Sequence, residues 1–233
     1  MALNVLFVGN SHTYLHYMPQ MLVQLAEGAG RGIGLNVDQV TGEGAALQWH
    51  WNNGPTREKI RSRRWDYVVL QDRSGGPLED PESFRTHARW LDGEIRRQGA
   101  QTVFYMTWAN KSRPDTQGIL ADAYATIAAE LNAVLAPVGL VWEKVQAMDD
   151  KINLYHIDDR HANPIGAYLT ACVFYAVFLE TSPEGLPATL RIEGKIRLDL
   201  AEDRAGFLQQ IAYDSVNNVE SIMRKVDRMT NNK

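Results

Sequence analysis

The sequence predicts an α/β fold in which a five-stranded parallel sheet lies between two layers of helices. Three observations lead to this prediction. Short apolar runs of strand length recur along the 233-residue chain, and longer segments with a helical pattern of apolar residues separate them. Small or polar residues follow the first four apolar runs at once. Because the carboxyl ends of parallel strands lie at the same edge of a sheet, we expect these four turns to lie together at that edge.

The elements follow from local signals taken in chain order. Glycines at 28, 30 and 32 suit a left-handed end to the first helix. Asp80-Pro81 and Asn163-Pro164 each pair a capping residue with a first-turn proline. The segment 182–200 is expected to be a small hairpin around Glu193-Gly194 or a loop. The expected strands cover 3–8, 34–40, 67–70, 102–106 and 138–141, and the expected helices cover 19–29, 55–63, 80–98, 115–135, 163–178 and 201–228.

Composition favours one globular domain that covers residues 1–233, with 45% hydrophobic and 22% charged residues. A net charge of −4 without a basic stripe predicts no nucleic-acid partner. The single cysteine, Cys172, excludes an internal disulfide and a thiolate metal cage. No apolar run approaches the roughly 20 residues that span a bilayer, and the first strand begins without a charged leader. We therefore expect a cytoplasmic protein without membrane contact, whose oligomeric state the sequence leaves open.

A turn of small and polar residues, Gly9-Asn10-Ser11-His12-Thr13, follows the first expected strand. Gly9 permits a tight backbone turn, and the free N–H groups of the next helix point to the same place as the Ser11 hydroxyl. Ser11 is therefore a candidate nucleophile at the carboxyl edge of the sheet. The alternative is that Ser11 only caps the helix, which is the commoner role of a serine at such a junction.

The stretch Asp158-Asp159-Arg160-His161 favours the catalytic interpretation. Asp158 lies three residues before His161, so its carboxylate can accept a hydrogen bond from the imidazole Nδ1–H and leave Nε2 free to take a proton from a serine. A D-x-x-H sequence alone is common. Here it follows the last expected strand and precedes a capped helix, at the same sheet edge as Ser11. We therefore predict a triad of Ser11, His161 and Asp158.

These motifs resemble those of the GDSL/SGNH-hydrolase superfamily over nearly the whole chain. The residues around Ser11 are similar to the block that carries the family's nucleophile, and those around His161 to the block with its Asp and His. The resemblance implies a flavodoxin-like three-layer fold and a serine esterase that uses no cofactor. Gly42-Glu43-Gly44-Ala45-Ala46 resembles the second block, whose glycine lends an N–H to the oxyanion hole. The resemblance thus implies that Gly44, rather than Gly42, acts there beside the Ser11 N–H.

The third block departs from the family's pattern. The family usually has Gly-x-Asn-Asp after the third strand, and the asparagine amide completes the oxyanion hole. Here the chain reads Leu70-Gln71-Asp72-Arg73-Ser74. Because the Gln71 amide can donate the same kind of hydrogen bond, Gln71 is the expected third donor. Ser74 and Arg73 are the alternatives.

The substrate is predicted from the aromatic residues. Trp49, Trp51 and Trp108 fall at or after carboxyl-end turns, and aromatic faces stack well on sugar rings, although the same indoles would equally suit a partly buried lid. We predict a hydrolase of small acyl esters, in particular a carbohydrate O-acetylesterase, with His12, Trp49 and Trp108 as candidate substrate-binding residues. Short-chain carboxylesterase, lysophospholipase and thioesterase activities are alternatives within this chemistry. A non-catalytic ligand-binding protein on the same fold is the alternative of another class.

Two other kinds of site are disfavoured. His12 and His16 are four residues apart and His50 could join them, but no H-E-x-x-H motif or nearby carboxylate accompanies them, so no metal is predicted. A phosphate cradle after the first strand would need a glycine-rich or basic loop, and residues 9–13 contain one glycine and no lysine or arginine.

Overall fold

A five-stranded parallel sheet forms the centre of the computed structural model, which describes residues 2–230, with side chains described for 2–219. Its strand order is β2-β1-β3-β4-β5, so β1 lies between β2 and β3. This is the flavodoxin-like order. The direction in which successive strands are added reverses between β1 and β3, and open α/β sheets bind ligands at the carboxyl ends of the strands beside such a reversal. The strands are β1 (Ala2–Gly9), β2 (Gly34–Thr41), β3 (Tyr67–Leu70), β4 (Gln101–Tyr105) and β5 (Val134–Ala136).

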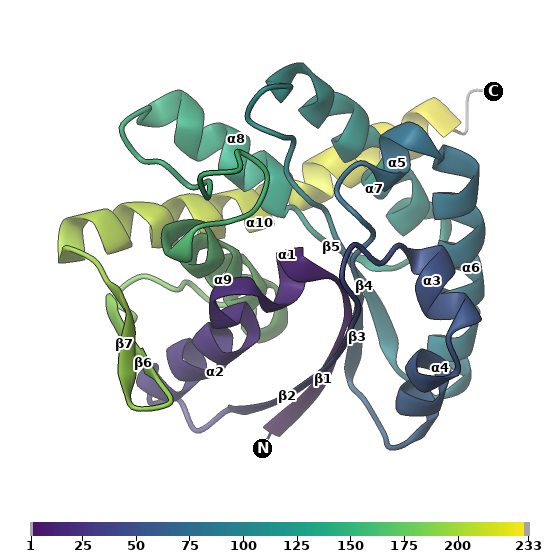
Figure 1. Cartoon of the computed structure of the whole chain (residues 1–233), viewed down its shortest axis with the longest axis horizontal. Coiled ribbons are helices and arrows are strands. Elements are labelled where there is room, and N and C mark those ends of the chain that lie inside the picture. The colour runs from purple at the N-terminus through teal and green to yellow at the C-terminus, as the bar shows by residue number, and fades with distance from the viewer. Residues whose placement is uncertain (1, 231–233) are drawn as a thin grey trace.

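Helices cover both faces of the sheet (Figure 1). One layer contains α2 (Met18–Gly28), α8 (Val138–Met148), α9 (Pro164–Leu179) and α10 (Glu202–Thr230). The other contains α3 (Leu47–Asn52), α4 (Gly54–Arg61), α6 (Pro81–Arg97) and α7 (Gln117–Glu130). The shorter pieces are α1 (Ser11–Tyr14), α5 (Gly76–Glu79), 3₁₀ turns at Leu15–Tyr17 and Pro114–Thr116, and a hairpin of β6 (Thr189–Ile192) and β7 (Lys195–Asp199).

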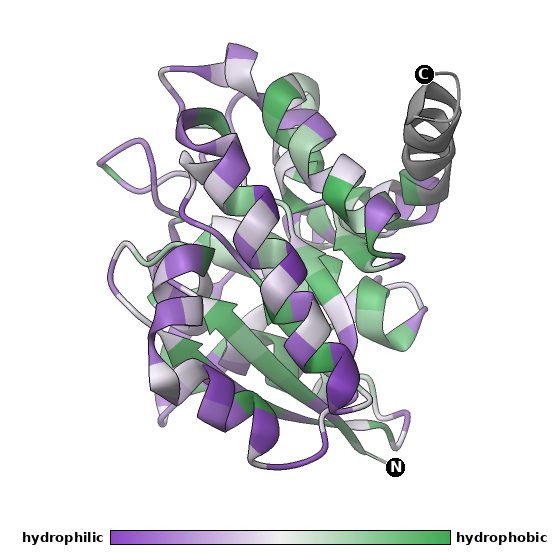
Figure 2. Cartoon of the chain, turned by 90° about the vertical axis from the view of Figure 1, so that its right-hand side faces the viewer, coloured by the Kyte–Doolittle hydropathy of each residue, from purple (hydrophilic) through white to green (hydrophobic). Residues whose placement is uncertain are grey.

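Strand β1 shows why the chain adopts three layers. Val5 and Phe7 belong to the core on the α2/α9 side, whereas Leu6 and Val8 belong to the core on the α3/α6 side. Successive side chains of a strand point to opposite faces, so an unbroken apolar run needs cover on both. Figure 2 shows the strands as a largely hydrophobic layer behind helices that carry a mixture of hydrophilic and hydrophobic residues.

The structure corrects the sequence prediction between β4 and α9. The helix expected at 115–135 ends at Glu130, and the strand expected at 138–141 is instead the first turn of α8. Asn132 adopts a left-handed backbone with φ of 45°, which terminates the helix. The true strand β5 comes earlier and pairs Leu135 with Phe104. Apolar runs this short do not distinguish a buried strand from a buried helix turn.

The hairpin alternative for segment 182–200 is confirmed, because β6 and β7 pair antiparallel around Glu193-Gly194. Both turn residues have a positive φ, which suits a tight hairpin turn. Within residues 2–230, none of the helices has the length and apolar character required to cross a membrane.

Candidate active site

The turn after β1 presents Ser11 without using its hydroxyl as a cap. Asn10 is the capping residue of α1, since its Oδ1 accepts a hydrogen bond from the His12 N–H at 3.0 Å. The Asn10 amide also donates to the Ala45 carbonyl at 2.9 Å, which ties this turn to the one after β2. Gly9 is required here, because an added Cβ would lie 2.4 Å from Gln71 Oε1. The Ser11 side chain is therefore free to face the opposite loop.

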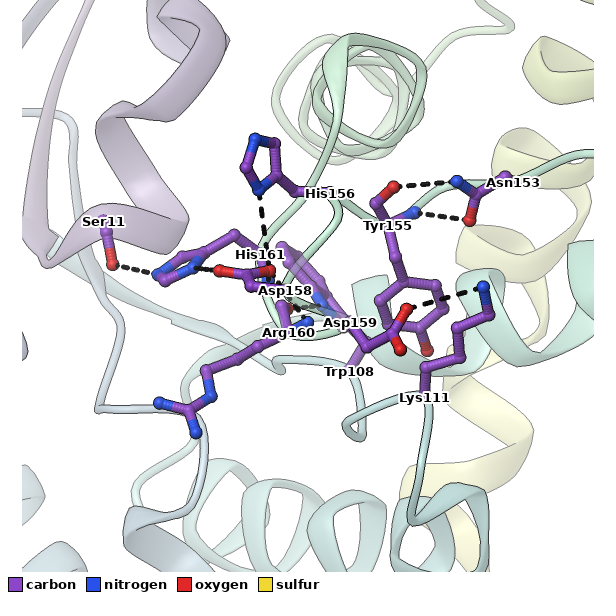
Figure 3. A network of polar contacts seen from close by, with 10 residues as sticks. All are labelled: Ser11, Trp108, Lys111, Asn153, Tyr155, His156, Asp158, Asp159, Arg160 and His161. Carbon is purple, nitrogen blue, oxygen red and sulfur yellow. Dashed lines mark hydrogen bonds and ion pairs between the residues drawn. The ribbon is translucent and has the colours of Figure 1, made fainter.

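Ser11, His161 and Asp158 form a continuous hydrogen-bonded chain (Figure 3). The Ser11 Oγ lies 2.8 Å from His161 Nε2, and His161 Nδ1 lies 2.5 Å from Asp158 Oδ2. With the proton on Nδ1, the imidazole donates to Asp158 and accepts from the serine hydroxyl. This is the geometry in which a histidine can remove the serine proton.

The Asp158 carboxylate is held in its ionised form. Its second oxygen, Oδ1, accepts the N–H groups of Arg160 at 3.1 Å and of His161 at 3.0 Å. Desolvation raises the pKa of this carboxyl, but the hydrogen bonds from the His161 side chain and from the two backbone N–H groups together lower it below its usual value. An ionised Asp158 is the form that orients the imidazole.

The loop of the histidine is fixed by its backbone. The His156 N–H donates to the His161 carbonyl at 2.8 Å, and the Trp108 indole N–H donates to the Arg160 carbonyl at 2.9 Å. Asn163 then begins α9 by capping the N–H groups of Ile165 and Gly166. These contacts hold the imidazole over the carboxyl end of β1.

A cavity of about 540 Å³ opens beside Ser11 and His161. Gly44 lines this cavity, in a left-handed conformation with φ of 60° and with its N–H unpaired among the described residues. Gly42 does not line it, and its N–H donates to the Gly9 carbonyl at 3.2 Å. Of the two glycines that the sequence offers for the oxyanion hole, only Gly44 thus has an N–H available at the cavity.

Gln71 does not reach this cavity, contrary to the sequence-based expectation. Its side chain is fully buried, and its Oε1 accepts hydrogen bonds from the Asn10 N–H at 2.8 Å and the Thr13 hydroxyl at 3.0 Å. Its amide nitrogen donates to the backbone carbonyl of Asp72. Gln71 therefore holds the turn after β1 in place, with both ends of its amide engaged.

Other polar side chains do line the cavity. Arg73 and Ser74, the alternatives named for the third block, are among them, and so is Asn110 in the loop after β4. Sequence reasoning missed Asn110, whose only signal was its position after a strand. A second cavity, of about 710 Å³, adjoins the first and shares Ser74 and Asn110 with it. Its walls include the apolar residues Pro77, Leu78, Pro81, Ile119, Leu120 and Ala123.

The two tryptophans proposed as substrate contacts lie elsewhere. Trp108 is 1% exposed and stacks on Trp142 with 3.8 Å between the ring centroids. Trp49 is 43% exposed, but it packs edge-on against His50 and does not line the cavity. Both placements contradict the prediction, because the aromatic faces are used for packing or point to solvent outside the cavity.

His12 does line the cavity, as the sequence suggested. Its ring is 5% exposed, and its centroid lies 4.8 Å from that of Trp108 and 5.1 Å from that of His161. Neither ring nitrogen has a hydrogen-bond partner among the described residues. Burial is the main cause that lowers the pKa of His12 to about 3, with smaller electrostatic contributions from His161 and Arg160. His12 is thus an uncharged wall of the cavity.

His50 is a supporting residue whose role the sequence did not reveal. It is fully buried on α3, where its Nε2 lies 2.9 Å from the Gly9 carbonyl and its Nδ1 lies 3.0 Å from the Thr56 hydroxyl. Burial lowers the pKa of His50 to about 4, so the neutral ring can donate to Gly9 and accept from Thr56. No cluster of three or more metal-ligating side chains occurs in the described part of the chain.

Comparison with solved structures shows the family of this chain. A protein from Slackia heliotrinireducens, provisionally named an SGNH hydrolase, is 30% identical and aligns over 76% of this chain and 99% of its own, with a TM-score of 0.63. The chain belongs to the SGNH hydrolase family. No model of a protein family matches the sequence, and a search among curated proteins finds no match.

Two more distant SGNH-fold structures share the architecture. The acetyl xylan esterase AlAXEase is 15% identical over 76% of this SGNH hydrolase and 100% of its own chain, with a TM-score of 0.63. A variant of an acetyl-xylooligosaccharide esterase from Geobacillus is 14% identical over 75% of this chain and 93% of its own, with a TM-score of 0.59. At these identities the likeness concerns the α/β/α fold alone.

Proposed function

We propose that this SGNH hydrolase cleaves carboxylic esters with Ser11 as nucleophile, His161 as general base and Asp158 as the residue that orients the imidazole. The observation that carries the proposal is the 2.8 Å contact between Ser11 Oγ and His161 Nε2, continued to Asp158 at 2.5 Å. A serine is a weak nucleophile unless a base removes its proton, and such a base contributes about 10²–10⁴ in rate.

The reaction proceeds through an acyl-enzyme. Ser11 Oγ attacks the ester carbonyl while its proton passes to His161 Nε2, and the resulting imidazolium is stabilised by Asp158. His161 then gives that proton to the departing alcohol oxygen as the C–O bond breaks. Water, deprotonated by the same imidazole, attacks the acyl carbon and releases the acid and the free Ser11 hydroxyl.

The oxyanion would be stabilised by donors at the mouth of the cavity. The Ser11 N–H and the Gly44 N–H are the backbone candidates, and Asn110 offers a side-chain amide from the loop after β4. Because Gln71 is buried under the turn, it contributes by holding Asn10 and Thr13 in place. One such oxyanion donor is usually worth about 10²–10³ in turnover.

The substrate class we propose is a small acyl ester, with acetylated carbohydrate as the first candidate. Support comes from the polar lining of the cavity, which includes Ser74, Asn110 and Arg160, and which suits a hydroxylated alcohol better than a long acyl chain. Two structural neighbours are named as esterases of acetylated xylan or acetylated xylooligosaccharide, which agrees with this candidate.

A panel of p-nitrophenyl esters tests the proposal. We expect kcat/KM to be highest for the acetate and to fall as the acyl chain lengthens, because added methylenes would lie against charged and polar side chains. Acetate release from acetylated xylose, followed in parallel, tests the alcohol half. A rise in kcat/KM with chain length would contradict the acetyl preference and would assign the adjoining apolar cavity to the acyl chain.

A further inference from the structure

Arg160 occupies a defined place beside the proposed base. It directly precedes His161 and lines the same cavity. Its backbone is held on both sides, since its N–H donates to Asp158 Oδ1 at 3.1 Å and its carbonyl accepts the Trp108 indole N–H at 2.9 Å. These two hydrogen bonds fix the backbone from which the Arg160 side chain extends, just as the loop contacts fix the backbone of His161.

The Arg160 guanidinium itself has no partner among the described side chains, although two aspartates precede it in sequence. Asp158 is engaged by His161, and Asp159 lies 3.5 Å from the Lys111 ammonium. In Figure 3 the guanidinium extends away from both carboxylates. An arginine carries its charge at every ordinary pH and presents donors in a planar fork. This fork is free at the cavity.

The other charged residues that line the cavity do not neutralise the Arg160 guanidinium. Arg73 and Glu79 also line the cavity, but they pair with each other at 2.7 Å. Glu43 lines it from the turn that carries Gly44, and it forms no ion pair with Arg160 in the described part of the chain. The His12 ring is buried, and neither ring nitrogen has a hydrogen-bond partner among the described residues, so it adds no ion pair to the cavity. Positive charge is thus concentrated on the His161 side and negative charge on the Gly44 side.

The position of Arg160 indicates which half of the ester it meets. His161 delivers its proton to the leaving oxygen, so the alcohol half must lie next to the imidazole, whereas the carbonyl oxygen turns toward Gly44. Arg160 stands beside His161 and not beside Gly44. A group within reach of its guanidinium therefore belongs to the alcohol.

We propose that Arg160 is a specificity-determining residue that binds a carboxylate on the alcohol half of the substrate, as in an O-acylated hydroxy acid or acidic sugar. The proposal rests on the proposed esterase function. A guanidinium and a carboxylate form two parallel hydrogen bonds. A single carboxylate fits better than a doubly charged phosphate, because the cavity offers one unpaired guanidinium and also contains Glu43.

Binding of such a carboxylate would also assist the chemistry. Arg160 directly precedes His161 and lines the same cavity, so a substrate carboxylate seated on Arg160 lies near the imidazolium that forms at His161 during the reaction. The negative charge of that carboxylate favours the imidazolium. The effect should therefore be visible in kcat as well as in KM.

The test compares 4-acetoxybenzoate, which carries a carboxylate on the alcohol half, with its neutral methyl ester. The ratio of their kcat/KM values is measured for the wild type, Arg160→Gln, Arg160→Lys and Arg64→Gln. Arg64 is an exposed arginine just before β3, at the opposite end of the sheet, and its variant controls for net charge. Comparing the ratio between variants removes the intrinsic reactivity of the two esters.

We expect Arg160→Gln to lower the ratio about tenfold at low ionic strength, Arg160→Lys to lower it less, and Arg64→Gln to preserve it. The wild-type ratio should fall as salt screens the exposed pair. An unchanged ratio in Arg160→Gln, with the methyl ester still hydrolysed by the wild type, overturns the role of Arg160 and leaves the esterase intact. If the wild type hydrolyses neither ester, the proposed function fails and this inference fails with it.

Discussion

Ser11→Ala is expected to lower kcat for p-nitrophenyl acetate by about four orders of magnitude or more, because no other group in the described part of the cavity is placed to form the acyl-enzyme. The substitution removes one hydrogen bond, to His161 at 2.8 Å. It leaves the helix cap intact, since Asn10 and not Ser11 holds the start of α1. Stability should therefore change by no more than about 1 kcal/mol.

The measurement pairs initial rates with urea unfolding of the same preparation. Ser62→Ala is the matched control, because Ser62 lies on the surface at the end of α4 and its hydroxyl donates to the Lys59 carbonyl of the same helix. The control should retain wild-type rates. If Ser11→Ala retained the wild-type rate with an unchanged fold, the hydroxyl would not be the nucleophile.

Asp158→Asn is expected to lower kcat by about 10³–10⁴, whereas Asp159→Asn should stay within about twofold of the wild type. An asparagine at 158 replaces an acceptor with an amide that can donate, so the imidazole loses the partner that fixes its tautomer. Asp159 faces away from the imidazole and lies 3.5 Å from Lys111, with both side chains about half exposed. An exposed pair of this kind contributes little.

The two aspartate variants change neighbouring residues by the same chemical step, so each serves as the control of the other. Rates with p-nitrophenyl acetate and near-ultraviolet circular dichroism of both proteins complete the comparison. The opposite order, with Asp159→Asn the more damaged enzyme, would move the orienting role by one residue and would refute Asp158 as the partner of the imidazole.

The parts of the fold that sequence reasoning predicted are those fixed by local rules. Within the strand expected at 3–8, residues 5–8 form an unbroken apolar run followed at once by Gly9 and Asn10, and a strand that needs cover on both faces ends in such a turn. Asn163 and Pro164 begin α9 for equally local reasons. The stretch from 131 to 141 was misassigned because its type depends on pairing with β4, and pairing is a tertiary property.

The sequence motifs predicted which loops form the site, but not which of their side chains reach the cavity. Ser11 directly follows β1, whereas His161 lies in the loop between α8 and α9, and the fold brings the two side chains together at the carboxyl end of β1. Whether a side chain reaches a cavity depends on packing that no motif encodes. Gln71 has the right chemistry but lies under the turn, and Trp108 is turned into a stack with Trp142. Asn110 reaches the cavity from a loop that no motif marked.

The central claim is that the Ser11 hydroxyl is activated by His161, and covalent labelling with a fluorophosphonate tests it most directly. The serine oxygen would bond to phosphorus as fluoride leaves, and peptide mass spectrometry would locate the adduct. We predict one adduct per chain, on the peptide that contains Ser11, with labelling lost in His161→Ala. A wild-type protein that forms no adduct, or forms it on another residue, would contradict the account.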